Sequence, residues 1–311
     1  MPEWPDVHGQ TAELVSGTFG DQGRHWLRDL PDLVRTLAER WRLNPAGEAF
    51  PGARASFVAP VNDQRGRALV LKIAPGVPWV RQEYHALAYW DGNAAVRVVD
   101  ADLSLGALLL ERLDPGCSLA ASRDPEGDGT QVLVSVVSRF ERRRAVPAEL
   151  PRVETWLKKL DGTPADSAVP GLELERSVAR RVRDDLLGRA GRSGVLHADL
   201  HHGNLLRHGV DWTAIDPKGL IGPPEAEAAA FLRNPRRDIV GRPDGVTWTI
   251  ERARSIADGL AWELELVLGW AYVLGVLAAE WSLEDGEDLD DARRWLRCAL
   301  VLKAAYQAEV A

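Results

Sequence analysis

Residues 197–204 form a dense polar segment, His-Ala-Asp-Leu-His-His-Gly-Asn, and residues 214–219 follow it with Ala-Ile-Asp-Pro-Lys-Gly. Short apolar runs lie on both sides of the segment, so we expect it to be a loop between strands. Asp199 and Asp216 supply carboxylates and Asn204 supplies an amide oxygen, and such hard ligands suit Mg²⁺. Phosphoryl transfer from a nucleotide needs one carboxylate to hold the acceptor hydroxyl and further oxygens to hold the metal. The order of acid, amide and second acid therefore predicts a phosphoryl-transfer loop.

Two other interpretations of this segment stay open from the residues alone. Asp, Asn and His side chains in a loop often form only turns and caps. The three histidines within residues 197–202 could also mark a zinc site, although the sequence has no further His or Cys cluster to complete one. The spacing of the three oxygen donors and the flanking strand-like runs favour phosphoryl transfer.

A second feature is Lys72, which lies inside the apolar run Ala68–Ile73. A lysine within an apolar strand is costly unless it is paired. In a nucleotide kinase, such a lysine holds the α- and β-phosphates and pairs with a glutamate of the next helix. Glu83, on a helix predicted over Trp79–Trp90, is the candidate partner. A solvent-facing lysine on an edge strand is the alternative.

A third feature is the apolar run Leu108–Glu111, which passes into a short turn-rich link ending at Gly116. A strand that leads into such a link suits an adenine site, where backbone groups between Glu111 and Leu113 would bond the purine edge. A strand that merely ends in a turn would look the same.

The coarse layout is a small strand-rich region followed by a larger helical one. Residues 24–43 predict a helix with a break at Pro31. Ala55–Val61 and Ala68–Ile73 read as a hairpin, and Ala95–Val99 and Gly106–Glu111 as further strands. We therefore predict an N-lobe over residues 1–110, a hinge over 111–116 and a C-lobe over 117–311. Helical periodicity marks residues 130–143, 149–161, 172–190, 247–259, 261–280 and 288–308.

Length and composition fit a two-lobed globular enzyme. The chain has 311 residues, 45% hydrophobic and 27% charged, so it can bury a full core without disulfides. Its net charge of −8 argues against nucleic acid and is compatible with a cationic small molecule. Only two cysteines occur, no signal-like run opens the sequence, and the apolar run Leu266–Ala279 is too short for a bilayer. We expect a cytoplasmic protein without a membrane or protein partner.

The sequence resembles the aminoglycoside phosphotransferase branch of the kinase-like fold. The likeness is strongest to the streptomycin 6-phosphotransferase and hydroxyurea phosphotransferase group and spans roughly residues 20 to 240. Besides the polar loop, it rests on Gly23-Arg24-His25-Trp26 with Trp41, on Leu110-Glu111-Arg112-Leu113, on Ala-Ile-Asp-Pro-Lys at 214–218 and on Phe231-Leu232-Arg233-Asn234-Pro235.

The resemblance implies an α+β, two-lobed protein-kinase-like fold with a small antiparallel-sheet N-lobe and a larger, mainly helical C-lobe. It implies ATP and Mg²⁺ as cofactors. Asp199 is then the catalytic carboxylate, Asn204 and Asp216 are the magnesium ligands, and His197 and His201 support the loop.

On the nucleotide side, the resemblance makes Lys72 the phosphate-binding lysine and Glu83 its partner, and it places Glu111 and Leu113 beside the adenine. A glycine-rich phosphate loop is not recognisable in this sequence. The turn Phe50–Ser56 would have to serve in its place.

The predicted activity is ATP-dependent O-phosphorylation of a small hydroxylated molecule, with a streptomycin-type aminoglycoside as the first candidate. The family often has an aspartate in the helix after its metal-binding aspartate, where this chain has Glu225 and Glu227. Glu227 is the better positional match. These two and Glu263 are the candidate acceptor-binding carboxylates, because carboxylates pair well with guanidinium and ammonium groups. The alternatives are a metabolic kinase for an amino sugar, sugar or polyol, and a catalytically silent nucleotide-binding module.

Overall fold

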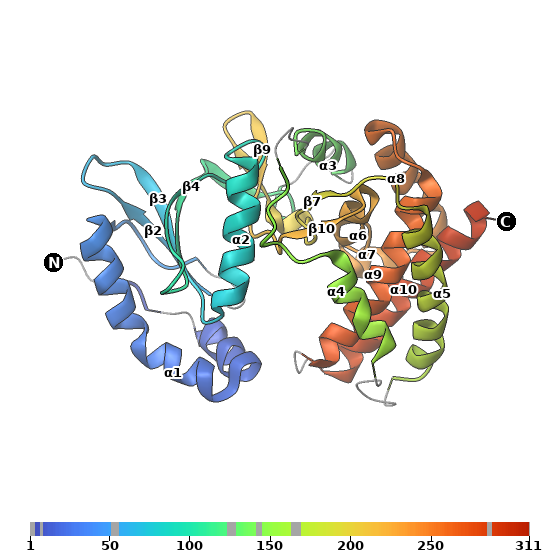
Figure 1. Ribbon diagram of the computed structural model, residues 1–311, viewed down its shortest axis with the longest axis horizontal. Helices are drawn as coiled ribbons and strands as arrows, with labels where there is room; N and C mark the ends of the chain where they lie inside the picture. Colours follow the sequence, from blue (N-terminus) through green and yellow to red (C-terminus); the bar gives the residue numbers. More distant parts are fainter. Residues whose placement is uncertain are drawn as a thin grey trace.

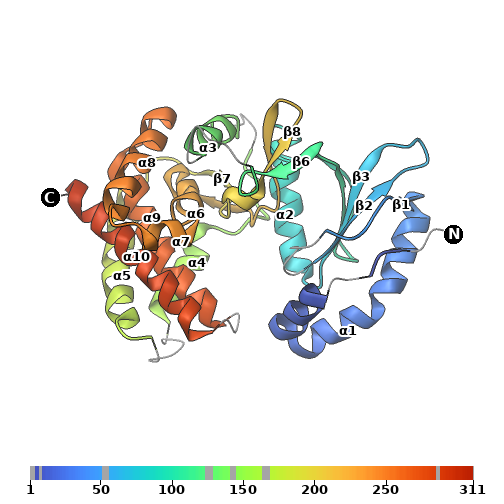
Figure 2. The ribbon, with the colours of Figure 1, turned by 180° about the vertical axis from the view of Figure 1, so that it is seen from behind.

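Two lobes form the protein in the computed structural model, a sheet-rich lobe at the N-terminal end and a helical lobe at the C-terminal end (Figure 1). The structure describes residues 4–6, 9–50, 56–122, 129–140, 145–162, 169–284 and 288–310. The two ends of the chain lie at opposite ends of the molecule, as the view from behind also shows (Figure 2). The architecture confirms the predicted α+β fold with a small antiparallel sheet and a mainly helical C-lobe.

The N-lobe is built around an antiparallel sheet. Its elements are α1 (Gly9–Trp41), β1 (Asn44–Pro45), β2 (Phe57–Asn62), β3 (Ala68–Ile73), α2 (Val77–Trp90), β4 (Val98–Asp102) and β5 (Ala107–Glu111). Among the described residues, the strand order is β1-β2-β3-β5-β4. The predicted hairpin of β2 and β3 is confirmed and pairs along its whole length. Asp63 fixes its turn, because the Asp63 carboxylate accepts hydrogen bonds from the amides of Arg65 and Arg67.

The N-lobe sheet separates two hydrophobic cores. Side chains alternate along a strand, so Leu71 and Ile73 of β3 pack with Leu37 of α1 on one face. Leu108 of β5 lies on the other face, which packs against α2 and is continuous with the core of the C-lobe. We call the α1 side the outer core and the α2 side the inner core. Lys72 points to the inner side, where α2 supplies its partner.

The long N-terminal helix bends at a different residue from the one that the sequence suggested. The predicted break at Pro31 is wrong, because Pro31 lies inside α1. The break is at Gly20, whose backbone (φ 54°, ψ −129°) is open to glycine and strained for other residues. Proline removes one hydrogen bond from a helix, but burial of Leu30 and Val34 in the outer core holds this turn together.

The segment after β5 enters a small sheet of the C-lobe. Residues 115–118 form a strand that was not predicted, because Pro115 and Gly116 are typical of turns. Ala95 was expected in an N-lobe strand, but it bridges Ala214, so the lobes also touch there. The strand-like runs beside the polar loop are confirmed. The C-lobe strands are β6 (Pro115–Ser118), β7 (Gly194–Leu196), β8 (Leu205–His208), β9 (Asp211–Ala214) and β10 (Leu220–Gly222), paired as β6-β8-β9 and β7-β10.

Helices surround these strands. They are α3 (Thr130–Val137), α4 (Val153–Leu157), α5 (Leu172–Arg189), α6 (Ala228–Leu232), α7 (Arg236–Gly241), α8 (Gly245–Leu260), α9 (Leu264–Glu284) and α10 (Leu289–Val310), with 3₁₀ turns at Lys158–Asp161, His202–Asn204 and Pro224–Glu227. The six predicted helical regions all contain helices, whereas the short α6 and α7 were not predicted. Helix α9 is long and apolar enough to cross a membrane, yet 89% of that stretch is buried within the protein. It is the central helix of the C-lobe core.

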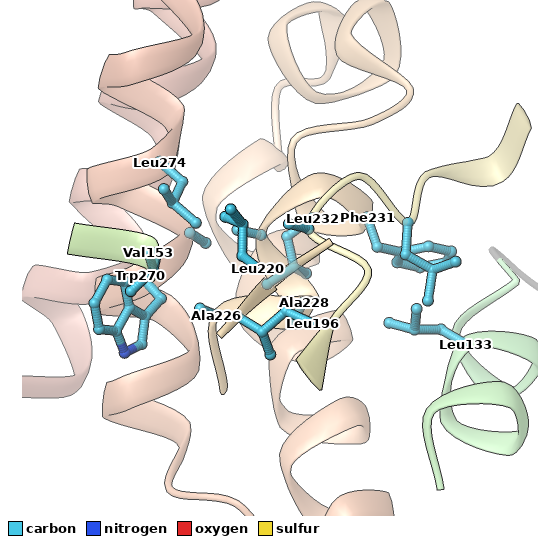
Figure 3. Packing of buried hydrophobic residues seen from close by; sticks show 14 of the residues in the cluster. Leu133, Val153, Leu196, Leu220, Ala226, Ala228, Phe231, Leu232, Trp270 and Leu274 are labelled. Carbon is cyan, nitrogen blue, oxygen red and sulfur yellow. The ribbon is translucent and has the colours of Figure 1, made fainter. Parts of the chain in front are cut away.

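The inner core lies directly beneath the strands that carry the polar loop. In Figure 3, Leu196 of β7 and Leu220 of β10 lie between Trp270 and Leu274 of α9 on one side and Phe231 on the other. Since Leu196 immediately precedes the loop and Leu220 closely follows Asp216, this packing fixes both ends of the polar segment.

We expect that Leu37→Ala lowers the free energy of unfolding by about 2–5 kcal/mol, because the leucine is fully buried between α1 and the sheet. Urea unfolding followed by circular dichroism measures the change. Leu14→Ala, on the same helix but exposed, should cost less than about 0.5 kcal/mol. Equal effects of the two substitutions would show that α1 does not belong to the folded core.

Candidate active site

The backbone of the polar loop is held by a buried histidine. The ring of His197 lies parallel to Phe140 of the C-lobe and near Trp90, the last residue of α2. Its Nε2 is 2.8 Å from the carbonyl oxygen of Ile215, and the amide of Asp199 donates to its Nδ1 at 3.3 Å. His197 therefore braces the loop as predicted, because its ring ties the polar loop to the segment before Asp216.

These two bonds require the neutral ring with the proton on Nε2, because Nδ1 must accept. Burial lowers the pKa of His197 to about 4, although the nearby carboxylate of Asp199 acts in the opposite direction. The imidazole is therefore uncharged at neutral pH and holds the loop without exchanging protons.

Glu227 holds the same loop from the other side. Its carboxylate accepts hydrogen bonds from the amides of His197 (2.6 Å) and Ala198 (3.1 Å). Ala198 has a left-handed backbone (φ 65°), which costs a non-glycine residue about 1–2 kcal/mol, so the loop needs this support. Burial raises the pKa of Glu227 to about 7, while the two amide bonds act against that rise. In this structure the Glu227 carboxylate is buried and bonded to the loop, and its predicted role in binding the acceptor stays a prediction.

Lys72 joins the two lobes through its ammonium group. Its Nζ lies 2.7 Å from Glu83 of α2 and 2.5 Å from Asp216 of the C-lobe. Burial alone would lower the pKa of Lys72, but the two carboxylates more than offset that effect and raise it. Burial alone would raise the pKa of Asp216, but Lys72 and Lys218 more than offset that effect and lower it. The lysine and the aspartate are therefore both charged at neutral pH.

A close backbone approach permits this contact between the lobes. Gly219 has a left-handed backbone (φ 66°), and a Cβ there would lie 2.7 Å from the carbonyl oxygen of Gln82 in α2. A larger residue would push α2, and with it Glu83, away from Asp216.

Six charged side chains form an alternating series across the junction of the lobes, which we call the charge chain. Beyond Asp216, the Nζ of Lys218 lies 3.4 Å from Asp216 and 3.5 Å from Asp199, and the guanidinium of Arg233 lies 3.6 Å from Asp199. The charge chain consists of Glu83, Lys72, Asp216, Lys218, Asp199 and Arg233.

Lys218 and Arg233 received no role from the sequence. The available signals were the scarcity of lysine in an arginine-rich chain and the inclusion of both residues in the motifs that carried the family resemblance. Arg233 has 8% of its side chain exposed and follows α6, so only the packing of that unpredicted helix brings it to Asp199.

The donor set of the loop fits a hard divalent cation. Asn204 donates from Nδ2 to the carbonyl oxygen of Asp199 (2.9 Å), so its amide oxygen is the atom of this side chain that could ligate a metal together with the Asp216 carboxylate. Oxygen donors of this kind suit Mg²⁺. The described residues contain no group of three His, Cys, Asp or Glu side chains that could hold a metal, so the zinc interpretation gains no support. His201 instead accepts from the amide of Gly203 (3.0 Å) within the loop.

The link between the lobes only partly matches the adenine site expected there. The Glu111 amide donates to the carbonyl oxygen of Arg97, and the Glu111 carboxylate accepts from the Arg97 amide. Leu113 is buried in the inner core. Contacts to a purine would therefore have to use the remaining backbone groups of residues 111–113. The phosphate turn expected at Phe50–Ser56 falls mostly on residues 51–55, outside the described residues.

The other two acceptor candidates lie near each other on the C-lobe. Burial raises the pKa of Glu225, and the neighbouring Glu263 raises it further. Glu263 is exposed and pairs with Arg189 at 3.0 Å, a residue that also contacts Glu265. Their predicted role in binding the acceptor stays a prediction.

A lysine that reaches from a sheet lobe to an acidic loop of a helical lobe is the hallmark of kinase-like phosphotransferases, and the fold and site place this chain in that class. Comparison with known proteins narrows the class. The chain belongs to the family of aminoglycoside/hydroxyurea antibiotic resistance kinases, whose sequence model matches residues 40–286. It is a phosphotransferase with an alcohol group as the acceptor.

The similarity extends over nearly the whole chain. The chain is 33% identical over 305 residues to a streptomycin 6-kinase of Streptomyces glaucescens, and the match covers 93% of this chain and 95% of that protein. It is 34% identical over 293 residues to a hydroxyurea phosphotransferase of Kitasatospora aureofaciens, covering 91% and 82%. The solved structure of an amicoumacin kinase shares the fold, with a TM-score of 0.60 at 18% identity over 90% of this chain and 94% of that one.

We expect that Glu227→Gln destabilises the protein by about 1–3 kcal/mol, because glutamine has one acceptor oxygen where two buried amides need partners. The turnover number should fall as well, since the loop that carries Asp199 loses a support. Thermal unfolding and steady-state kinetics measure the two effects. Glu225→Gln, which disturbs no loop amide, should leave the unfolding temperature close to that of the wild type; an equal loss in both variants would contradict the supporting role of Glu227.

We also expect the His197 ring to stay neutral, with the proton on Nε2, from pH 7 down toward its pKa of about 4. Because this pKa lies below the ordinary value of 6.5, neutral His197 contributes stability above pH 6.5 that is lost as the pH falls through this range. Imidazole ¹⁵N chemical shifts report the tautomer and its titration directly. A midpoint near 6.5 for this ring would rule out the buried, neutral brace.

Proposed function

We propose that this protein transfers the γ-phosphoryl group of ATP to a hydroxyl group of an aminoglycoside, with streptomycin as the first candidate acceptor. The observation that carries the proposal is the charge chain. In it, Lys72, the candidate phosphate-binding lysine, contacts Asp216, the candidate magnesium ligand, and Lys218 links Asp216 to the loop carboxylate of Asp199. The identity to a streptomycin 6-kinase over almost the full length of both proteins supports the choice of acceptor.

On the nucleotide side, we assign the α- and β-phosphates to Lys72. Its ammonium is kept charged and fixed in direction by Glu83, so it presents a ready cation to an anionic ligand. Asp216 and Asn204 would hold Mg²⁺. Bound there, the ion would neutralise charge on the phosphate oxygens.

On the acceptor side, Asp199 is the group that would receive the hydroxyl. Its side chain is 22% exposed, and the amides of its loop are fixed by His197 and Glu227. A carboxylate held in this way orients the attacking oxygen and takes its proton as the bond to phosphorus forms. A fixed loop matters because a catalytic group that is misplaced by about 1 Å can reduce the rate of the chemical step about 10²-fold.

The acceptor that fits the charge of the protein is cationic. The chain carries a net charge of −8, and Glu225 and Glu263 lie together on the C-lobe. Carboxylates of this kind pair with guanidinium and ammonium groups and are sensitive to salt. Hydroxyurea is the second candidate, and the 34% identity to a hydroxyurea phosphotransferase supports it.

The test is a phosphotransfer screen with the purified protein, ATP and Mg²⁺ against streptomycin, other aminoglycosides, hydroxyurea and neutral sugars. We expect turnover with a cationic aminoglycoside and an acceptor KM that rises with salt concentration. Asp199→Asn should lower the turnover number by about 10²–10⁴-fold while leaving ATP affinity near that of the wild type.

Asp211→Asn is the matched control, because Asp211 is an exposed aspartate in the β8–β9 hairpin. It should leave turnover unchanged. A neutral sugar as the best substrate, with a KM that does not respond to salt, would overturn the cationic-acceptor proposal and favour a metabolic kinase. Full turnover by the Asp199 variant would overturn the assignment of that carboxylate.

A further inference from the structure

We propose that Lys218 binds the phosphoryl group while it is being transferred and is thus a further catalytic residue; this inference rests on the phosphotransferase function proposed above. The position of its ammonium carries the inference. The Nζ of Lys218 lies between two carboxylates: that of Asp216, the candidate magnesium ligand, at 3.4 Å, and that of Asp199 in the loop at 3.5 Å. A phosphoryl group that moves from the nucleotide to a hydroxyl held by Asp199 has to cross this space.

The other two cations of the charge chain are held more tightly than Lys218, and Lys72 is already assigned to the α- and β-phosphates. Lys72 has 11% of its side chain exposed and bonds two carboxylates at 2.5–2.8 Å. Arg233 is almost fully buried behind Asp199. Lys218 differs from both, because 45% of its side chain is exposed and both of its contacts are longer than the 2.7–2.9 Å typical of charge-assisted hydrogen bonds. Its three donors can therefore turn to an incoming anion.

The backbone keeps the base of this side chain in place. The amide of Lys218 donates to the carbonyl oxygen of His197 at 2.9 Å, and Pro217 precedes it. The neighbouring Gly219 lies against α2. The lysine is thus anchored to the residue that braces the catalytic loop, while its four-carbon stem leaves the ammonium free to shift.

Electrostatics gives the lysine a task in this position. An anionic phosphoryl group between Asp199 and Asp216 meets two carboxylates, and like charges at close range in a partly buried site cost energy. A cation placed where negative charge develops lowers the barrier without reorganising during the reaction. A lysine side chain carries a positive charge at neutral pH, and this ammonium has a carboxylate within 3.5 Å on each side.

In the step itself, the bond between the γ-phosphorus and the oxygen that bridges it to ADP breaks, and its electron pair stays on ADP. The acceptor hydroxyl oxygen forms the new bond to phosphorus, and its proton passes to the carboxylate of Asp199. Lys218 remains an ammonium throughout. It donates hydrogen bonds to a non-bridging oxygen of the group in transfer and exchanges its contacts with the carboxylates for that bond.

Lys218→Met tests the inference, with Lys218→Arg as the conservative variant and Lys158→Met, an exposed lysine of the C-lobe, as the control. We measure the turnover number, the affinity for Mg²⁺–ADP alone, and the affinity for Mg²⁺–ADP with aluminium fluoride, which mimics the planar phosphoryl group. The methionine variant should lose about 10²–10³-fold in turnover. It should keep the affinity for ADP and lose the additional affinity that aluminium fluoride confers. Arginine should restore part of both losses.

A purely structural lysine gives a different pattern. Equal losses of ADP and ADP–aluminium fluoride affinity, or near-normal turnover in Lys218→Met, would overturn the inference. The nucleotide measurements need no acceptor. Failure of the wild type to phosphorylate any aminoglycoside would therefore count against the acceptor proposal alone, while binding of the fluoride complex would still decide the role of Lys218.

Discussion

The buried ammonium of Lys72, held between a carboxylate from each lobe, is the contact on which the architecture of the site depends. Removing a charge from water is expensive, and the cost is offset here only because Glu83 and Asp216 both lie within 2.7 Å. Side chains alternate between the two faces of β3, and this alternation must turn Lys72 toward α2. Helix α2 must also approach the segment after Asp216 so closely that residue 219 has to be a glycine. The positions of a strand, a helix and a loop are thereby set by one cation.

The charge chain extends this principle across the site. Its three carboxylates and three cations alternate, so each charge has neighbours of the opposite sign and the set is balanced in the free protein. Two further groups support the loop: the neutral ring of His197, and the side chain of Glu227, which accepts hydrogen bonds from two loop amides. The loop thus combines a rigid backbone with side chains that can exchange partners when an anion enters.

The sequence predicted those parts of the molecule that local pattern determines. A lysine in an apolar strand followed by a glutamate on the next helix predicted a pair that is present, and the apolar run before Glu280 predicted a buried helix. What it missed depends on contacts between distant segments. Arg233 reaches Asp199 only through the packing of α6, and Glu227 was expected beside the acceptor because its bonds to the amides of residues 197–198 depend on the folded chain. The sequence predicted a helix break at Pro31, but burial of the neighbouring side chains in the outer core stabilises the helix by more than the loss of one hydrogen bond costs.

The division of the protein into an outer and an inner core places every member of the charge chain on one side of the N-lobe sheet. The α1 layer contributes stability and touches none of them. Substitutions in that layer would therefore alter how many molecules persist in the cell, since small losses of stability change abundance several-fold. Substitutions in the inner core would also cost stability, and in addition they would displace the strands that carry the polar loop. Variation in the α1 layer can thus change the amount of folded protein while leaving the charge chain of each folded molecule unchanged.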